Sequence, residues 1–161
     1  MARRPNVILI NCDDLGYGDL ACYGSSTVQT PHIDHFAGTG LRLTNCYAAS
    51  ANCSPARAGL LTGRTPYRAG IHNWIPMLSP MHLRRGEITL SGLLHQAGYT
   101  TCHVGKWHLN GNKKVQYKTG SPLQRGFDEF VAIRGGDSSF WKGTPVFRGE
   151  KQFPAPEYLT D

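Results

Sequence analysis

The sequence lacks long apolar runs, and this argues against a membrane-spanning helix. Its longest uninterrupted aliphatic run covers residues 7–10, whereas a helix that crosses a bilayer needs roughly 20 apolar residues. No apolar signal-peptide core follows Arg3 and Arg4 either. We therefore expect a cytoplasmic chain as the sequence is written, and a periplasmic or secreted one if the N-terminus is incomplete.

Paired cysteines and long basic runs are lacking as well. The five cysteines are an odd number and include no Cys-x-x-Cys pair, so neither a disulfide framework nor a structural zinc site is expected. We expect most of them to be reduced, buried thiols. The formal net charge of +6 is compatible with an anionic substrate. The basic residues are scattered and form no run longer than a pair, as at 84–85 and 113–114, so nucleic acid is not an expected partner.

What the sequence does contain is an alternation of strand and helix signals. With 161 residues, 40% of them hydrophobic, the chain can form a domain with its own core. Strands are predicted at residues 7–11, 41–47, 99–104 and 127–133, and helices at about 30–40, 54–63 and 89–98. Residues 65–87 and 110–125 are expected to be irregular. This order predicts an α/β fold with a mainly parallel sheet flanked by helices.

Residues 53–57 carry the strongest chemical signal. Cys53 lies just before a helix that Ser54 is expected to cap and Pro55 to open. Arg57 follows one helical turn later, so the thiol and the guanidinium are both expected near the positive end of the helix dipole. Such a place favours a sulfate-like or phosphate-like group. The alternative is that Cys53 is a small buried packing residue.

Two further polar motifs follow predicted strands. Asp13 and Asp14 come directly after the first strand, and paired carboxylates favour Ca²⁺ or Mg²⁺, although a simple turn uses the same residues. Lys106 and His108 follow the strand at 99–104. An extended backbone would place both on one side, where they suit an anionic oxygen and proton transfer, although a solvent-facing strand end is the alternative. Because ligands bind at the carboxyl edge of open α/β sheets, the three motifs together predict one site.

These motifs resemble those of the type I sulfatase family. The stretch from Cys53 to Arg57, with its Leu-Thr-Gly-Arg continuation, resembles the family's Cys-x-Pro-x-Arg signature. The aspartate pair and the Gly-Lys-Trp-His-Leu string are similar to further family segments. The resemblance implies an alkaline-phosphatase/sulfatase-like fold and an arylsulfatase-like sulfuric ester hydrolase. It also implies that a formylglycine-generating, or sulfatase-maturing, enzyme converts Cys53 to formylglycine (3-oxoalanine), which serves as the nucleophile.

The resemblance assigns a role to each residue of the predicted site. Lys106 and His108 would contact the formylglycine or the sulfate-ester substrate. A divalent cation, usually Ca²⁺ with Mg²⁺ as the alternative, would bind to Asp13, Asp14 and residue 53. The catalytic residues that the resemblance implies are Cys53, Arg57, Lys106 and His108.

The resemblance covers nearly the whole chain but only the N-terminal part of the family. We therefore expect residues 1–161 to be the N-terminal part of a sulfatase catalytic domain, with the C-terminal remainder absent. Tight Ca²⁺ binding takes about six to eight oxygen ligands, so the isolated chain should bind metal weakly and have little or no activity. Two alternatives are a phosphoryl-transfer enzyme of the same architecture, with Ser54 as nucleophile, and a non-catalytic sulfatase-derived domain.

Overall fold

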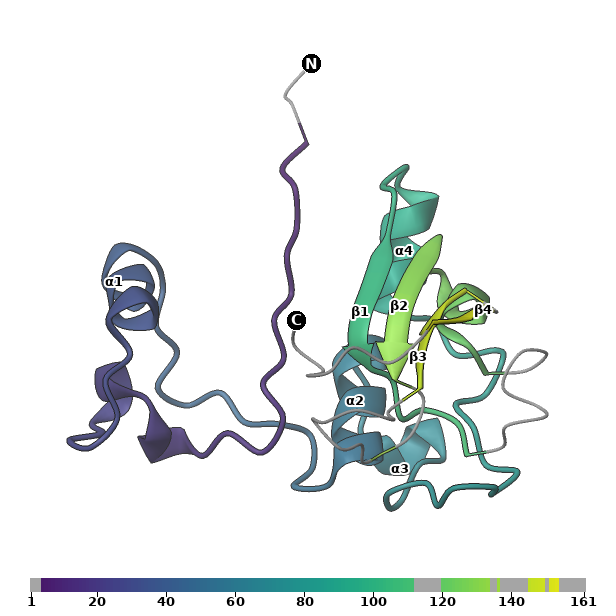
Figure 1. Ribbon diagram of the computed structural model, residues 1–161, viewed down its shortest axis with the longest axis horizontal. Helices are drawn as coiled ribbons and strands as arrows, with labels where there is room; N and C mark the ends of the chain where they lie inside the picture. The colour runs from purple at the N-terminus through teal and green to yellow at the C-terminus, as the bar shows by residue number, and fades with distance from the viewer. Residues whose placement is uncertain (1–3, 112–119, 134–135, 137–144, 150, 154–161) are drawn as a thin grey trace. The chain divides into compact units, whose positions relative to one another are not determined.

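The computed structural model describes residues 4–111, 120–133, 136, 145–149 and 151–153. The chain divides into two compact units, Met1–Cys46 and Tyr47–Asp161, each of which is described by itself. Figure 1 shows the first unit in purple and blue, and the second in teal, green and yellow. Within the described ranges, no helix has both the length and the apolar character that crossing a bilayer requires.

The first unit is built around one helix, as the sequence predicts. Its elements are the 3-10 turns η1 (Tyr17–Asp19) and η2 (Ala21–Tyr23) and the helix α1 (Pro31–Thr39). Pro31 occupies the first helical position and Gly40 is the C-cap residue. Asp34 of α1 fixes η2, because its Oδ1 accepts hydrogen bonds from the backbone N–H of Cys22 (2.8 Å) and from the Thr30 hydroxyl (3.0 Å).

The strands predicted at residues 7–11 and 41–47 are wrong for the structure as described. Neither segment pairs with another strand among the described residues. The aliphatic side chains of residues 7–10 are 54–85% exposed, whereas the sequence predicts a strand buried on both faces. An apolar run does not by itself form a strand of a sheet, because the ladder hydrogen bonds must come from a neighbouring segment.

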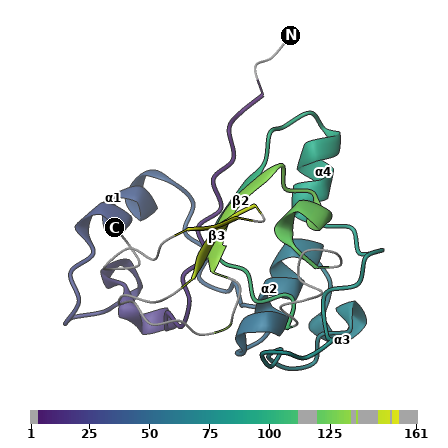
Figure 2. The ribbon, with the colours of Figure 1, turned by 45° about the vertical axis from the view of Figure 1, so that its right-hand side comes forward.

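The second unit combines a sheet with three helices. The helices are α2 (Cys53–Thr62), α3 (Pro66–Ala69) and α4 (Leu90–Gln96), and a 3-10 turn, η3 (Pro122–Arg125), follows later. The strands are β1 (Cys102–Lys106), β2 (Glu129–Ile133), β3 (Val146–Arg148) and β4 (Lys151–Phe153). Figure 2 shows α2, α3 and α4 together on one side of the sheet.

The sheet is mixed within the described residues. Its strand order is β1-β2-β3-β4. β1 and β2 are parallel, with His103 opposite Phe130, whereas β3 runs antiparallel to both β2 and β4. Side chains along β2 alternate, so that Phe130 and Ala132 are buried and Val131 is exposed. The carboxyl end of β1 lies against α2, where Arg57 Nη1 donates to the carbonyl oxygen of Lys106.

The core of the second unit gathers between α2, α3 and the segment after them. Residues 65–87 lack a regular period, as expected, but they form the short helix α3 and contribute much of the core. Trp107 is buried and its indole Nε1–H donates to the carbonyl oxygen of Gly120 (2.7 Å). The buried cluster consists of Ala58, Ala69, Ile71, Ile75, Leu83, Trp107 and Leu109.

Other local predictions are confirmed or corrected in detail. Thr89 caps α4, because its Oγ1 accepts a hydrogen bond from Gly92 N (3.1 Å), and Gly98 has the positive φ expected just after the helix. The strand predicted at 99–104 begins and ends later, at Cys102 and Lys106. Just before it, Asp128 Oδ2 accepts hydrogen bonds from the backbone N–H and the hydroxyl of Thr101 (2.7 and 2.9 Å). The hairpin β3–β4 was not predicted. Residues 112–119, part of the predicted loop, lie outside the described residues.

The prediction of mostly buried thiols is wrong. The five cysteines are free, but Cys12, Cys46 and Cys102 are exposed, while Cys22 and Cys53 are partly buried. Cys12 directly follows residues 7–11 and Cys46 lies within residues 41–47, two predicted strands that are unpaired among the described residues.

Candidate active site

Cys53 is the first residue of α2, so the helix begins earlier than predicted, where Cys53 was expected just before it. Asn52, with extended backbone angles, is the N-cap residue, and the C-cap residue Gly63 has a positive φ. Cys53 is partly buried. Its backbone N–H belongs to the first turn, where N–H groups have no acceptor within the helix and the dipole is positive. The environment therefore suits an anion beside residue 53, as expected.

The prediction that Ser54 caps this helix is wrong. Ser54 lies inside α2 and is fully buried, and its Oγ accepts a hydrogen bond from the backbone N–H of Ile75 (3.0 Å). The hydroxyl therefore bonds a distant segment of the chain and does not cap the helix. This burial also weakens the phosphoryl-transfer alternative, because a nucleophile must reach its substrate.

Arg57 connects the start of α2 to the end of β1. Its Nη1 donates to the carbonyl oxygen of Lys106 (2.5 Å), and the side chain is partly buried. Lys106 is the last residue of β1. The hydrogen bond therefore holds the guanidinium of Arg57 against the backbone of Lys106, the other cationic residue of the predicted site. Arg57 lies one helical turn from Cys53.

His108 lies on a backbone that departs from the predicted extended form. Its φ is +50°, in the left-handed region, so the argument that places Lys106 and His108 on one side of a strand fails. The His108 side chain is buried, and its Nε2 lies 3.0 Å from the carbonyl oxygen of Ile75. Because a carbonyl oxygen only accepts, Nε2 carries a proton, and in neutral imidazole Nδ1 is then the basic nitrogen.

The absence of a side chain at Gly136 leaves space for the His108 ring. A Cβ atom at position 136 would fall inside van der Waals contact with the ring atoms Cε1, Nε2 and Nδ1 of His108. The imidazole is thus fixed by the Ile75 carbonyl at its edge and by the bare backbone of Gly136 nearby. The sequence offered no signal for either partner, since both are distant along the chain.

Asp13 and Asp14 belong to the first unit and are exposed. Asp14 has a φ of +59°, a conformation that few residues other than glycine adopt. No group of three His, Cys, Asp or Glu side chains that could hold a metal occurs in the part of the chain that the structure describes. Two carboxylates have the right chemistry for a hard cation, but they supply too few oxygens to complete its shell.

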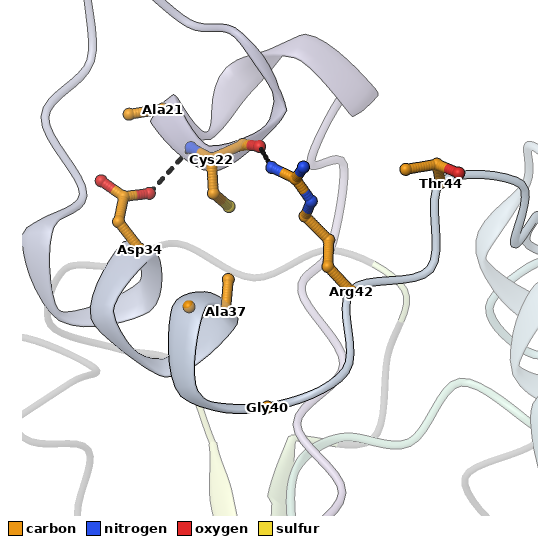
Figure 3. A pocket seen from close by; sticks show the side chains of 8 residues that line it. Ala21, Cys22, Asp34, Ala37, Gly40, Arg42 and Thr44 are labelled. Atoms are coloured by element: carbon orange, nitrogen blue, oxygen red, sulfur yellow. Dashed lines mark hydrogen bonds between the residues drawn. The ribbon is translucent and has the colours of Figure 1, made fainter.

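A hollow in the first unit holds a second thiol, but the surroundings make that thiol unreactive. Burial, followed by the hydrogen bond and the charge of Asp34, raises the pKa of the Cys22 thiol above its ordinary value. The thiol therefore stays protonated and is a poor nucleophile. Arg42 instead bonds the carbonyl oxygen of Cys22 (Figure 3). The hollow is lined by Ala21, Cys22, Asp34, Ala37, Gly38, Gly40, Arg42 and Thr44.

His103, on β1, is a partly buried histidine that packs among aromatic rings. Burial, together with the charge of Arg57, lowers its pKa from 6.5 to about 4. Its ring lies between those of Trp107 and Phe127, with centroids 5.2 and 5.4 Å away. His103 is therefore neutral at pH 7 and adds no positive charge beside Arg57.

The comparison with known folds defines the class of this protein. The solved structure of Ps i-CgsB superposes with a TM-score of 0.88 at 30% identity, and the match covers 99% of this chain and 39% of that one. The α/β class and the alkaline-phosphatase-like fold are thereby confirmed. The family model described as Sulfatase matches residues 5–149. The chain belongs to the sulfatase family.

Curated relatives agree with this family assignment. A steryl-sulfatase from Homo sapiens is 43% identical over an alignment of 140 residues. The alignment covers 82% of this chain and 24% of the relative. An N-acetylgalactosamine-6-O-sulfatase from Bacteroides thetaiotaomicron is 48% identical over 108 residues, 67% of this chain and 21% of the relative. The chain spans about a quarter of the length of these relatives.

Proposed function

We propose that this protein hydrolyses sulfate esters, with residue 53 as the nucleophile after conversion of Cys53 to formylglycine. The observation that carries the proposal is the placement of Cys53. It is the first residue of α2, and Arg57 one turn later is bound to the carbonyl oxygen of Lys106. Family membership supplies the reaction class, and this geometry supplies a cationic place for the sulfate group.

Formylglycine would give residue 53 an aldehyde hydrate, one hydroxyl of which would attack sulfur while the S–O bond to the alcohol breaks and the alcohol leaves with a proton. The second hydroxyl would then lose its proton and form the C=O bond of the aldehyde again, while the C–O bond to the sulfate breaks and sulfate leaves; water restores the hydrate. The residues around it have separate tasks. The backbone N–H groups at the start of α2 and the charges of Arg57 and Lys106 would offset the negative charge of the sulfate oxygens. His108, with Nε2 held by Ile75, would exchange a proton at Nδ1.

Asp13 and Asp14 are proposed to contribute to a Ca²⁺ site, with Mg²⁺ as the alternative. Their oxygens fit a hard cation in kind, and residue 53 is the third proposed ligand. The described residues do not complete the coordination shell. We therefore propose that residues 1–161 form the N-terminal part of a catalytic domain that further chain completes.

The first experiment examines residue 53 itself. The protein is produced in a host that contains a formylglycine-generating enzyme, the partner that the proposal requires, and the peptide bearing residue 53 is analysed by mass spectrometry. We expect the thiol to be replaced by an aldehyde, whereas Pro55→Ala and Arg57→Ala variants should be converted less. An unmodified thiol throughout would refute the assignment of the nucleophile.

The second experiment separates sulfate from phosphate chemistry. The sulfate and phosphate esters of one phenol, 4-nitrophenol, are compared as substrates of the mature full-length protein, in which further chain is proposed to complete the domain. The proposal expects turnover of the sulfate ester, loss of turnover in Cys53→Ala, and little hydrolysis of the phosphate ester. Preference for the phosphate ester would favour the phosphoryl-transfer alternative, and no turnover of either ester would favour a non-catalytic domain.

A further inference from the structure

The first turn of α2 runs beside the segment 73–75, and hydrogen bonds fix how the two align. Asn52 Nδ2 donates to Asn73 Oδ1 (2.9 Å), and Ile75 N donates to Ser54 Oγ (3.0 Å). Asn52 and Ser54 are the two neighbours of Cys53 along the chain. Asn73 and Ile75 are likewise the two neighbours of Trp74. The two hydrogen bonds therefore bring the backbone of Trp74 close to the backbone of Cys53.

The backbone at Trp74 is held firmly, while its side chain is open to solvent. Trp74 N donates to Asn73 Oδ1 (2.8 Å), the same atom that receives the Asn52 amide. On the other side, Ile75 is buried and its carbonyl oxygen receives the hydrogen bond from His108. The Trp74 side chain is nevertheless 53% exposed. A large indole left exposed on a fixed backbone is suited to contact a ligand.

We propose that Trp74 determines specificity by contacting the alcohol part of the sulfate ester. This inference rests on the proposed function, in which the sulfate group lies at residue 53. The carbon skeleton begins one oxygen atom away from the sulfur, so its first ring would lie within reach of the segment 73–75 beside the first turn of α2. The chemistry that indole recognises is an apolar ring face, either of an aromatic ring or of a pyranose. Recognition of the sulfate group itself stays with the cationic residues.

The contact can be tested at the unmodified thiol, without any turnover. The chain is produced in a host that lacks maturation, and is labelled with N-phenylmaleimide or N-methylmaleimide. In both cases the thiolate adds to the carbon–carbon double bond, and the neighbouring carbon takes a proton from water. Mass spectrometry of the peptides gives the ratio of the two rates at each cysteine. Cys102 on β1, which is exposed, serves as the internal reference.

We expect the phenyl-to-methyl ratio to be higher at Cys53 than at Cys102 and to fall about fivefold in Trp74→Ala, as expected for loss of one aromatic contact. Trp74→Phe should retain most of the preference. Met77→Ala is the matched control, because Met77 follows on the same segment and is 58% exposed. An unchanged ratio in Trp74→Ala, or a Cys53 that neither reagent labels, overturns the proposal.

Steady-state kinetics of the mature protein then identify the ring. Trp74→Ala should lower kcat/KM about fivefold for 4-nitrophenyl sulfate or for a sulfated N-acetylhexosamine, and the ester affected shows which ring is recognised. Inhibition by inorganic sulfate should be unchanged. Equal weakening of sulfate inhibition would mean general damage to the site and would overturn the proposal. A parent protein without turnover whose labelling still depends on Trp74 would refute the proposed function alone.

Discussion

Acid should destabilise this protein through His103. The ring of His103 packs between Trp107 and Phe127, and burial, followed by the nearby charge of Arg57, lowers its pKa from 6.5 to about 4. The unfolded chain has no such environment, so there His103 titrates near its ordinary value. Between these two pKa values the unfolded chain binds a proton that the folded protein does not.

The sign and size of the effect follow from this difference. Because the folded pKa is depressed, the free energy of unfolding falls as the pH falls below about 6.5, and the loss is complete below about 4. One pKa unit corresponds to about 1.4 kcal/mol, so the full loss is about 3 kcal/mol and the part between pH 7 and pH 5 is about 2 kcal/mol. A small domain is stable by only about 5–15 kcal/mol.

Urea-induced unfolding at pH 7 and pH 5 measures this loss. The variant His103→Phe keeps an aromatic ring between Trp107 and Phe127 but cannot take up a proton, so its acid-induced loss should be smaller by about 2 kcal/mol. The matched control is His72→Phe, which changes a histidine that packs against Tyr67 on the exposed surface. Equal acid sensitivity in His103→Phe and the parent protein would refute the reasoning.

Three further predictions concern the site. Ser54→Ala should cost about 1–3 kcal/mol of stability, measured by urea unfolding, because the buried N–H of Ile75 loses its acceptor; retained sulfate-ester turnover would show that Ser54 is not the nucleophile. Gly136→Ala should cost about 1–3 kcal/mol and move the His108 imidazole resonances in NMR spectra, since a Cβ atom would meet the ring. Calorimetric titration of the 161-residue chain should give a Kd for Ca²⁺ above about 1 mM, whereas a micromolar value would show that other residues complete the shell at Asp13 and Asp14.

The helices were predictable because their signals are local. The ends of α2 and α4 follow from short-range chemistry, with Gly63 closing one helix and Thr89 capping the other. The cap of α2 was assigned to Ser54 because the residue type is right for it. The actual choice depended on Ile75, whose position relative to α2 the local sequence does not contain.

The strands were less predictable because each depends on a partner. The parallel pair β1–β2 was found because both segments have apolar patterns and both are paired in the described residues. Residues 7–11 have a stronger apolar pattern, yet no described segment pairs with them. The motifs at 53–57 and 106–108 could be found from residue types. The closeness of segment 73–75 to the first turn of α2 could not, because it depends on hydrogen bonds between segments about 20 residues apart.

Backbone strain marks two of the residues that the sequence analysis selected for chemistry. Among the described residues, three other than glycine have a positive φ, namely Asp14, Leu78 and His108. Such conformations cost on the order of 1 kcal/mol or more and persist only where the surroundings hold them. Leu78 is held through its N–H, which bonds the carbonyl oxygen of Gly111, and His108 is held by Ile75. The strand β1 ends at Lys106, and the strained turn at His108 follows, with the imidazole bonded to the Ile75 carbonyl oxygen. The N–H of Ile75 bonds Ser54 in the first turn of α2. The strained residue is therefore connected, through Ile75, to the helix turn that begins at Cys53.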